Sequence, residues 1–453
     1  MSPVETIAAI STPPGRGGIG IVRLSGRDAC PIAGKLVELR APLAHAHARL
    51  AWVLDDSTPP RRIDEAVVTF FSAPNSYTSD DLVEIAAHGS PVVLDLLLRR
   101  ALGLGARLAQ PGEFTERAFL SGRIDLTQAE AVRDLIDAKT LAQARQAASQ
   151  LGGALSLRVQ PVKRALLELI ALLEAGIDFA EDDLSVATTE EIARRINGLL
   201  PPLEALEKSF AGGRILHDGL TLAIVGRPNA GKSSLFNRLA ERERAIVTAT
   251  PGTPRDLVTE RIAIDGIPME LVDTAGVREA LEEVEKIGIE RTHQALADAS
   301  IVLVVLDATA PLNGDELKLL RAIEGRAALI VRNKCDLPRA ASPQPPLPSS
   351  LAVVETSALT GGGLTELRAV ILKLATGGAA AEPGALTTLR HRDAVRLALA
   401  ALKKSAEANV QHTPHEMLLL DLHSALEQLD ELTGQTSTED VLNLIFSTFC
   451  IGK

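Results

Sequence analysis

The chain has 453 residues, of which 46% are hydrophobic and 2% aromatic, and its formal net charge is -11 at pH 7. This length is enough for several domains with full cores. The acidic balance and the scarcity of aromatic rings argue against a broad electrostatic or stacking surface for nucleic acid, so any RNA contact must be local.

Export and disulfide signals are missing from the sequence. It has no apolar run of about 18 residues and no signal-like start, which predicts a soluble, cytoplasmic protein. The cysteines Cys30, Cys335 and Cys450 are too few and too scattered for a disulfide framework or a zinc site, which fits a reducing compartment.

Residues 1–118 predict an α+β domain. Residues 19–24 and 66–71 are short runs rich in β-branched side chains, and residues 91–104 form a leucine-rich helix candidate. Residues 12–20 contain G-x-G-x-x-G, the pattern of a dinucleotide-binding loop. Two prolines precede the first glycine and the following residues are strand-like, so we interpret this stretch as a structural loop instead.

Helical periodicity begins near residue 119 and returns beyond residue 377. Thr127 and Glu130 have the spacing of a capping box, and an apolar seam starts at Val159. The glycines at 212–213 and Gly219 are expected to loosen the chain just before the phosphate-binding pattern at 226–233. Near the end, Gly434 is a predicted helix stop and Thr436 a predicted helix cap. We expect residues 119–213 and 377–453 to pack as one bundle, with 214–376 inserted as a domain whose ends lie close together.

The inserted segment contains a complete phosphate-binding pattern. Residues 226–233 read Gly-Arg-Pro-Asn-Ala-Gly-Lys-Ser, after an apolar strand-like run and before helix-forming residues. Glycines let backbone N–H groups surround phosphate oxygens, Lys232 supplies a point charge for the outer phosphates, and the Ser233 hydroxyl suits Mg2+. Alternation of strand and helix signals around it predicts a mostly parallel, doubly wound sheet, with a hairpin turn at 265–266.

Further motifs predict that the bound nucleotide is GTP. Asp336, in Asn-Lys-Cys-Asp at 333–336, can accept hydrogen bonds from the ring N–H and the amine of guanine, a donor pair that adenine lacks. Residues 356–358 complete the base pocket. Asp273 supplies the carboxylate that holds Mg2+ through water, and Gly276 supplies a backbone N–H for the γ-phosphate. The motif residues assigned to GTP are Asn229, Ala230, Gly231, Lys232, Ser233, Ser234, Asp273, Thr274, Ala275, Gly276, Asn333, Lys334, Asp336, Ser357 and Ala358.

The residue that orients the attacking water is not set by these motifs. Val277 follows the Asp-Thr-Ala-Gly segment where many signalling GTPases have a glutamine. Carboxylates follow nearby, at Glu279, Glu282, Glu283 and Glu285. In a helix-prone segment these are also the pattern of a solvated face, so the residues alone leave both interpretations open.

Segments outside the GTP motifs resemble the tRNA modification GTPase MnmE (TrmE) family across essentially the whole chain. They are residues 6–9 with 12–20, residues 111–120 (Pro-Gly-Glu-Phe-Thr-Glu-Arg-Ala-Phe-Leu), residues 125–131, and the terminal Phe-Cys-Ile-Gly-Lys at 449–453. The resemblance implies a multidomain fold. Its parts are an α+β, tetrahydrofolate-binding-like N-terminal domain, an α-helical bundle domain and an inserted Ras-like α/β P-loop GTPase domain.

The resemblance also implies an activity. Members are homodimers joined through their N-terminal domains, and K+ accelerates GTP hydrolysis when two GTP domains meet. With the FAD protein MnmG (GidA), in an expected heterotetramer, they add aminomethyl or carboxymethylaminomethyl groups to C5 of the wobble uridine of certain tRNAs. The one-carbon donor is a tetrahydrofolate derivative, 5-formyl- or 5,10-methylene-tetrahydrofolate. No role with DNA or a membrane is implied.

By motif position the resemblance assigns further residues. Glu285 would orient the attacking water, with Lys232 as the other catalytic residue. K+ would be bound by Asn229 of the phosphate-binding pattern together with Thr248, Thr250 and Thr253 of a second GTP-binding loop, which includes Gly252. The ion would stabilise developing charge as an arginine finger does. Folate contacts would fall on Arg23, Glu84, Arg123 and Lys453, where a carboxylate can accept from a pterin edge and cations suit the glutamate tail.

The chain departs from the family at Pro254. The family loop reads Gly-Thr-Thr-Arg-Asp, and Pro254 replaces the second threonine, the expected Mg2+ ligand of the closed state, with a residue that lacks a hydroxyl. We expect a modest defect in closure and turnover. An alternative function is a GTP-driven switch or scaffold in ribosome assembly without one-carbon chemistry, although the sequence shows no RNA-binding appendage. For Cys450 we favour a structural role over a catalytic thiol.

Overall fold

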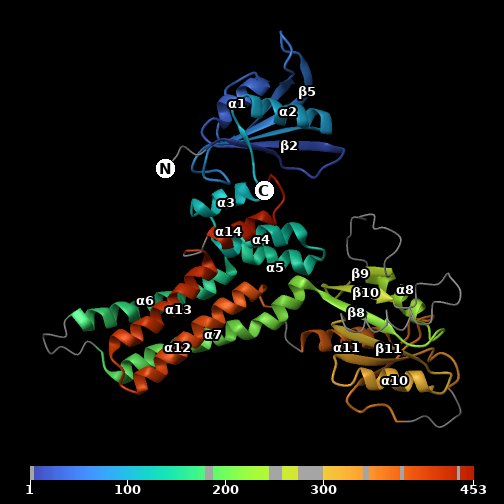
Figure 1. The fold of residues 1–453 in the computed structure, drawn as a ribbon. Helices are drawn as coiled ribbons and strands as arrows, with labels where there is room; N and C mark the ends of the chain where they lie inside the picture. Colours follow the sequence, from blue (N-terminus) through green and yellow to red (C-terminus); the bar gives the residue numbers. More distant parts are fainter. Residues whose placement is uncertain are drawn as a thin grey trace. The chain divides into compact units, whose positions relative to one another are not determined.

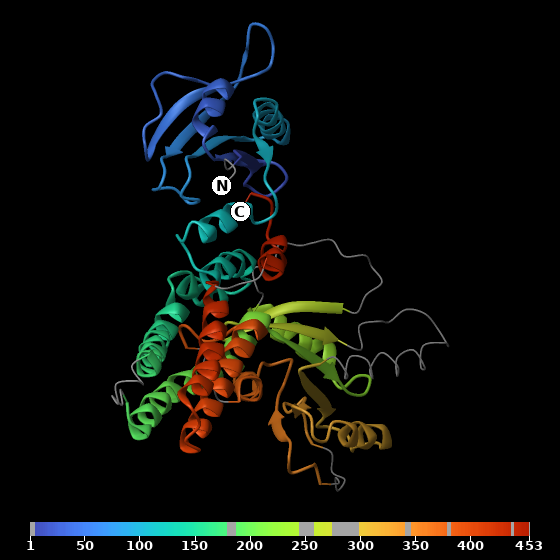
Figure 2. The ribbon, with the colours of Figure 1, turned by 60° about the vertical axis from the view of Figure 1, so that its left-hand side comes forward.

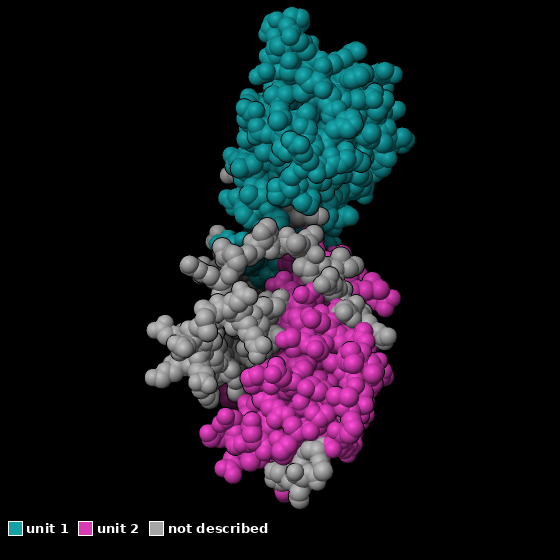
Figure 3. Space-filling view, turned by 90° about the vertical axis from the view of Figure 1, so that its right-hand side faces the viewer, with its two compact units in different colours: residues 1–133, 430–453 teal, residues 134–429 magenta. Residues whose placement is uncertain are grey.

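The computed structural model describes residues 5–178, 187–243, 258–273, 299–339, 346–377, 382–435 and 439–452. The chain forms two compact units, which Figure 3 colours separately. Unit 1 comprises Met1–Arg133 and Asp430–Lys453, and unit 2 comprises Asp134–Leu429. Within the described residues, none of the helices is long and apolar enough to cross a membrane.

A seven-stranded sheet organises unit 1, in the order β3-β4-β5-β6-β2-β1-β7. Neighbouring strands are antiparallel except β1 and β7, which are parallel. The strands are β1 (Ile7–Ile10), β2 (Gly17–Ser25), β3 (Val37–Leu39), β4 (His47–Leu54), β5 (Arg62–Phe71), β6 (Leu82–Gly89) and β7 (Arg107–Leu108).

Two helices, α1 (Ala29–Leu36) and α2 (Pro91–Gly103), lie over this sheet (Figure 1). Alternate residues of β2 and β6 enter one core with Leu94 and Leu97 of α2, as expected where one face of a sheet is covered. The strands predicted at 19–24 and 66–71 are confirmed as β2 and β5, and the predicted leucine-rich helix is confirmed as α2.

The glycine-rich stretch 12–20 is not wholly a loop, because β2 already begins at Gly17. Gly17 pairs with Gly89 of β6, and the register shifts between Gly17 and Gly20. A Cβ on Gly20 would lie 2.4 Å from Leu94 Cδ1, and one on Gly89 would lie 2.5 Å from the Gly17 carbonyl oxygen. These glycines permit close packing within the sheet and on α2. A strand follows them, so the rejection of a dinucleotide loop is confirmed.

Further helices of unit 1 join segments from both ends of the chain. They are α3 (Glu113–Leu120), α4 (Leu126–Asp137, which continues into unit 2) and α14 (Glu439–Ser447). Leu126 and Ala129 of α4 share a core with Ile445 and Phe446 of α14. An isolated bridge between Pro111 and Ile451 joins the last described residues to the segment before α3.

The cap of α4 differs from the prediction. Gln128 N donates to Asp125 Oδ1, and Asp125 N donates to Gln128 Oε1, each at 2.9 Å. The capping box predicted at Thr127 and Glu130 is therefore wrong, because the helix begins at Leu126 and places Thr127 inside it. The predicted helix stop at Gly434 is confirmed, with φ +86° directly after α13. The cap predicted at Thr436 lies outside the described residues.

Long helices of unit 2 lie side by side in Figures 1 and 2. They are α6 (Ala154–Asp178), α7 (Thr189–Asp218), α12 (Leu389–Val410) and α13 (His415–Thr433, whose residues from Asp430 on belong to unit 1), and the shorter α5 (Leu141–Leu151) precedes them. The apolar seam predicted from Val159 is confirmed, since Val159, Val162, Leu166, Leu169 and Leu173 are all buried. Their spacing places them on one stripe of α6.

Gly212 and Gly213 do not loosen the chain as predicted, because α7 continues through them to Asp218 and ends at Gly219, whose φ is +78°. A Cβ on Gly213 would lie 2.2 Å from the Leu386 carbonyl oxygen. This glycine therefore lets the segment before α12, at Leu386, pass directly against α7, near the end of α7 that leads into β8. The structure thus explains the glycine by a close approach of two backbones.

A six-stranded sheet lies between α7 and α12 in the sequence, in the order β13-β12-β11-β8-β10-β9. Its pairs are parallel except for the hairpin of β9 and β10, which turns at Asp265 and Gly266 as predicted. The strands are β8 (Leu220–Val225), β9 (Val258–Ile264), β10 (Ile267–Asp273), β11 (Ile301–Asp307), β12 (Ala328–Asn333) and β13 (Ala352–Glu355).

Helices cover both faces of this sheet. One core holds residues of α8 (Lys232–Glu243) and α11 (Leu364–Thr376), and a separate core on the other face holds residues of α10 (Gly314–Ala322). The predicted doubly wound α/β sheet is therefore confirmed. The carboxyl ends of its parallel strands meet at one edge, which is where ligands bind in such folds.

Candidate functional site

The phosphate-binding pattern forms the turn between β8 and α8. Gly226 and Gly231 have φ values of +147° and +91°, and Asn229 has φ +64°. A Cβ on Gly226 would lie 2.3 Å from Val305 O, and one on Gly231 would lie 2.1 Å from Asn333 Nδ2. Both glycines are therefore required by close contacts as well as by their backbone conformation.

Lys232 begins α8 and is only 6% exposed. Its Nζ donates to the carbonyl oxygens of Gly226 and Arg227, each at 2.8 Å, so the ammonium group lies within the loop that precedes it. Ser233 and Ser234 are exposed in the first turn of the same helix. The N-terminus of α8, with the positive end of its dipole, and the ammonium group of Lys232 thus lie at one place, an arrangement suited to phosphate.

A cavity of about 440 Å³ adjoins this loop. Asn333 is 1% exposed and connects its walls, because Nδ2 donates to Ala230 O and Oδ1 accepts from Ala358 N, each at 3.0 Å. Asp336 is exposed and lines the cavity. The lining residues are Gly231, Ser234, Asn237, Arg238, Asn333, Lys334, Asp336, Leu337, Ser357, Ala358 and Leu359.

The predicted base-recognition residues are thus brought together with the phosphate loop. Among the lining residues, sequence reasoning missed Asn237, Arg238, Leu337 and Leu359. Arg238 Nη2 donates to Leu359 O at 2.8 Å, which ties α8 to the loop after β13. A helical spacing of three to four residues from Ser234 could have pointed to Asn237 and Arg238, because both lie one turn further along the same face.

Some predicted residues cannot be placed. Asp273 ends β10, where its backbone pairs with Ile224 of β8, so it reaches the same edge of the sheet as the phosphate loop. The other predicted residues of this region lie outside the described residues. They are Thr248, Thr250, Gly252, Thr253, Pro254, Thr274, Ala275, Gly276, Val277, Glu279, Glu282, Glu283 and Glu285.

In unit 1, Arg23 and Glu84 face one another on neighbouring strands β2 and β6. Arg23 Nη2 lies 2.6 Å and Nε 3.0 Å from Glu84 Oε1, and Nη1 donates to Gly452 O at 3.4 Å. The guanidinium carbon also lies 5.5 Å from the ring centre of Phe114 and 5.9 Å from that of Tyr77. The residues are therefore a partly buried pair rather than separate surface charges.

The other two predicted folate residues are placed less completely. Arg123 is exposed after α3, and its charge acts on Tyr77: burial raises the pKa of Tyr77, and Arg23 and Arg123 partly oppose that shift. Lys453 lies outside the described residues. Cys450 is exposed and lies next to the bridged Ile451.

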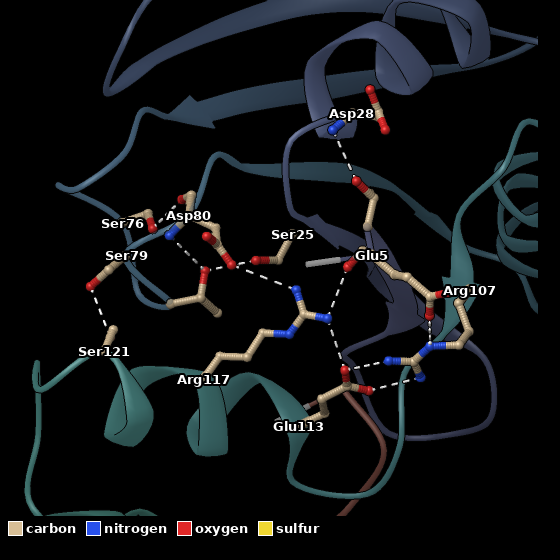
Figure 4. A network of polar contacts seen from close by, with 12 residues as sticks. Glu5, Ser25, Asp28, Ser76, Ser79, Asp80, Arg107, Glu113, Arg117 and Ser121 are labelled. Carbon is tan, nitrogen blue, oxygen red and sulfur yellow. Dashed lines mark hydrogen bonds and ion pairs between the residues drawn. The ribbon is translucent and has the colours of Figure 1, made fainter. Parts of the chain in front are cut away.

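A network of ion pairs ties α3 to the sheet of unit 1 (Figure 4). Glu113 Oε1 lies 2.6 Å from Arg107 Nη2 and 2.9 Å from Arg117 Nη2, and Arg107 also pairs with Glu5 at 2.9 Å. Burial alone would raise the pKa of Glu113, but the two guanidinium groups and the Gln110 backbone N–H lower it. The network positions Phe114, the next residue along α3, against Arg23.

Comparisons with known proteins cover nearly the whole chain. The model for the MnmE helical domain matches residues 126–450, and that for the GTP-binding protein TrmE N-terminus matches residues 6–123. A tRNA modification GTPase MnmE from Koribacter versatilis is 54% identical over 455 residues, with 99% of each chain covered. That from Aquifex aeolicus is 41% identical over 450 residues, covering 99% of this chain and 100% of the relative.

Similar solved structures match a smaller part. A variant of Era from Aquifex aeolicus bound to GDP.AlF4- is 28% identical and covers 40% of this chain and 66% of its own, with a TM-score of 0.29. The G domain of the T. maritima FeoB iron transporter is 25% identical and covers 34% of this chain and 98% of its own, with a TM-score of 0.25.

Proposed function

The chain belongs to the MnmE family of tRNA modification GTPases, and we propose that K+ stimulates its GTP hydrolysis and that it acts with the FAD protein MnmG (GidA) on the wobble uridine of certain tRNAs. The proposed reaction adds an aminomethyl or carboxymethylaminomethyl group at C5. The proposal depends chiefly on two observations together: a family member is 54% identical over nearly the full length, and Arg23 contacts both Glu84 and the Gly452 carbonyl.

GTP would bind along the edge of the six-stranded sheet. On binding, Lys232 would exchange its two carbonyl partners for the outer phosphates, which gain a cation already desolvated and aimed at the loop. Asp336 would accept from guanine at the far end of the cavity. Mg2+ prefers oxygen ligands, and the exposed Ser233 hydroxyl at the start of α8 fits that requirement.

The remaining hydrolytic roles are proposed by motif position. Asn229, an oxygen donor in the phosphate loop, fits K+, with Thr248, Thr250 and Thr253 as the other ligands. Glu285 would hold the attacking water. Pro254 offers no oxygen to Mg2+, so we propose that closure around the nucleotide is weaker than in relatives with threonine there.

A tetrahydrofolate derivative, 5-formyl- or 5,10-methylene-tetrahydrofolate, would supply the one-carbon unit. The donor set of unit 1 fits it, because Glu84 offers a carboxylate acceptor whose orientation Arg23 fixes. Arg123 and Lys453 would supply cations for the glutamate tail. Tyr77 and Phe114, whose rings lie beside Arg23, would add apolar surface for a ring system.

We propose that residues 1–118 form the domain that binds folate and joins the dimer. Residues 119–213 and 377–453 would form the helical domain, and residues 214–376 the domain that hydrolyses GTP. The assembly would be a homodimer that joins MnmG in a heterotetramer. A tRNA substrate implies a cytoplasmic location and contacts that are local, given the net charge of -11.

Reconstitution tests this function. The full-length protein is incubated with MnmG, FAD, the folate donor, GTP and tRNA in KCl, and C5-modified uridine is measured by mass spectrometry of nucleosides. Arg23→Ala should abolish modification and folate binding while GTP turnover continues. Arg27→Ala, an exposed arginine on the same segment, serves as the matched control. GTP turnover without folate binding in the unaltered protein would contradict the proposal and favour the ribosome-assembly switch or scaffold.

A further inference from the structure

Asp307 lies between the two loops that form the proposed GTP site. It is the last residue of β11 and pairs in register with Asn333, where the guanine-recognition motif begins. Its side chain is 10% exposed. Neither the phosphate-binding pattern nor the guanine-recognition motif includes it, so its role is not assigned by either.

The carboxylate of Asp307 is fully engaged. Oδ1 accepts from Thr309 N at 2.9 Å and from Thr309 Oγ1 at 2.6 Å. Oδ2 accepts from Lys334 Nζ at 2.8 Å and lies 3.5 Å from Arg227 Nη2. Burial alone would raise the pKa of Asp307, but the hydrogen bonds from Lys334 and Thr309 outweigh it and lower the pKa to about 2.

Lys334 is held in an uncommon conformation. Its φ is +67°, a region that residues other than glycine rarely adopt, so surrounding contacts must fix it. It lines the base cavity while its ammonium group reaches Asp307. The ion pair therefore directs the ammonium group of Lys334 toward Asp307 and away from the cavity, while the methylene groups of Lys334 line the cavity.

Arg227 belongs to the phosphate loop, and its own carbonyl accepts from Lys232. The Arg227 guanidinium lies between Asp307 and Glu316 of α10, with Nε 3.4 Å from Glu316 Oε1. Glu316 is 3% exposed and is itself fixed by the capping box that it forms with Asn313. Asp307 thus contacts one cation from each of the two loops.

We propose that Asp307 is a positioning residue that couples the phosphate loop to the guanine-binding loop. Each loop then adopts its nucleotide-binding conformation only when the other loop has done so. The inference rests on the proposed guanine site. Because one carboxylate holds both cations, removing its charge leaves Lys334 and Arg227 to repel one another near the site. The loops would then order separately, and nucleotide binding would have to supply that ordering.

Asp307→Asn tests the coupling. The amide oxygen can still accept from Thr309, so the turn after β11 is kept while the charge is lost. We expect KM for GTP and Kd for GDP to rise about tenfold, with kcat at saturating GTP little changed, because nucleotide binding then has to supply the ordering of the two loops. The matched control is Asp315→Asn, on an exposed α10 carboxylate that pairs only with Lys318 among the described contacts.

A double-mutant cycle gives a second measurement that a purely structural role would not affect. Lys334→Met should weaken GDP binding less in the Asp307→Asn background than in the unaltered protein, because the pair acts as a unit. Additive effects, or an unchanged KM in Asp307→Asn, would overturn the inference. Failure of the guanine site itself is distinguished by Asp336→Asn, whose preference between GTP and XTP does not depend on Asp307.

Discussion

We predict that the region where α7 leads into β8 loses stability as the pH rises, because His217 loses its proton there. Its Nε2 lies 3.2 Å from Asp134 Oδ1 and its Nδ1 lies 2.8 Å from Asp218 Oδ1. The hydrogen bond with Asp134, opposed by burial and assisted by Asp218, raises the pKa of His217 to about 9. The backbone carbonyl of the same residue accepts from Gln143 Nε2 of α5 at 2.9 Å, so the site joins two helices.

The magnitude follows from linkage. A rise from 6.5 to about 9 corresponds to about 3 kcal/mol of stability, which we reduce to roughly 2 kcal/mol because the side chain is 25% exposed and partly screened. The folded pKa is raised, so this stability is fully present below pH 6.5 and is lost as pH rises through about 9. His217→Gln removes the titrating group and should remove the pH dependence.

Hydrogen exchange measured by mass spectrometry is the suitable assay, since a chain of several domains need not unfold in one step. Opening free energies at the end of α7 are compared at about pH 6 and about pH 9.5, corrected for intrinsic exchange. Between these two pH values, the opening free energy should fall by roughly 2 kcal/mol more in the unaltered protein than in His217→Gln. His47→Gln, an exposed histidine of unit 1, is the control. Equal losses in all three proteins would refute the reasoning.

Further predictions concern the GTP site. Gly231→Ala should abolish measurable binding of fluorescent GDP, because its Cβ would overlap Asn333 Nδ2 at φ +91°; undiminished affinity would show that the loop adapts freely. Glu285→Ala should retain GTP affinity but lose about 10²-fold or more in single-turnover hydrolysis, whereas unchanged turnover would place the water elsewhere. Pro254→Thr should raise K+-stimulated turnover over the unaltered protein, and no gain would count against a missing Mg2+ ligand.

Much of the fold could be predicted from local patterns in the sequence. The phosphate loop, the seam of α6 and the hairpin turn at Gly266 were predictable because each depends on spacing within one element or on a residue with special backbone freedom. The errors also have local causes. Asp125 competes with Thr127 for the cap of α4, and Gly213 serves a distant backbone rather than a loop.

Contacts between distant segments could not be predicted. Arg23 meets Glu84 only because β2 and β6 pair in that register, and Gly452 reaches Arg23 from the other end of the chain. Asp307 likewise gains its partners from two loops that the sheet brings to one edge. A single sequence gives periodicity within an element but not the register between elements, so these pairs needed the three-dimensional fold.

The most direct test of the account is the nucleotide preference of Asp336→Asn. Xanthine carries a carbonyl where guanine carries its amine, so an asparagine amide should donate to xanthine where the carboxylate accepted from guanine. Binding of GTP and XTP is measured for both proteins by titration. The unaltered protein should prefer GTP, and the variant should prefer XTP. A variant that keeps its preference for GTP would contradict the placement of guanine beside Asp336.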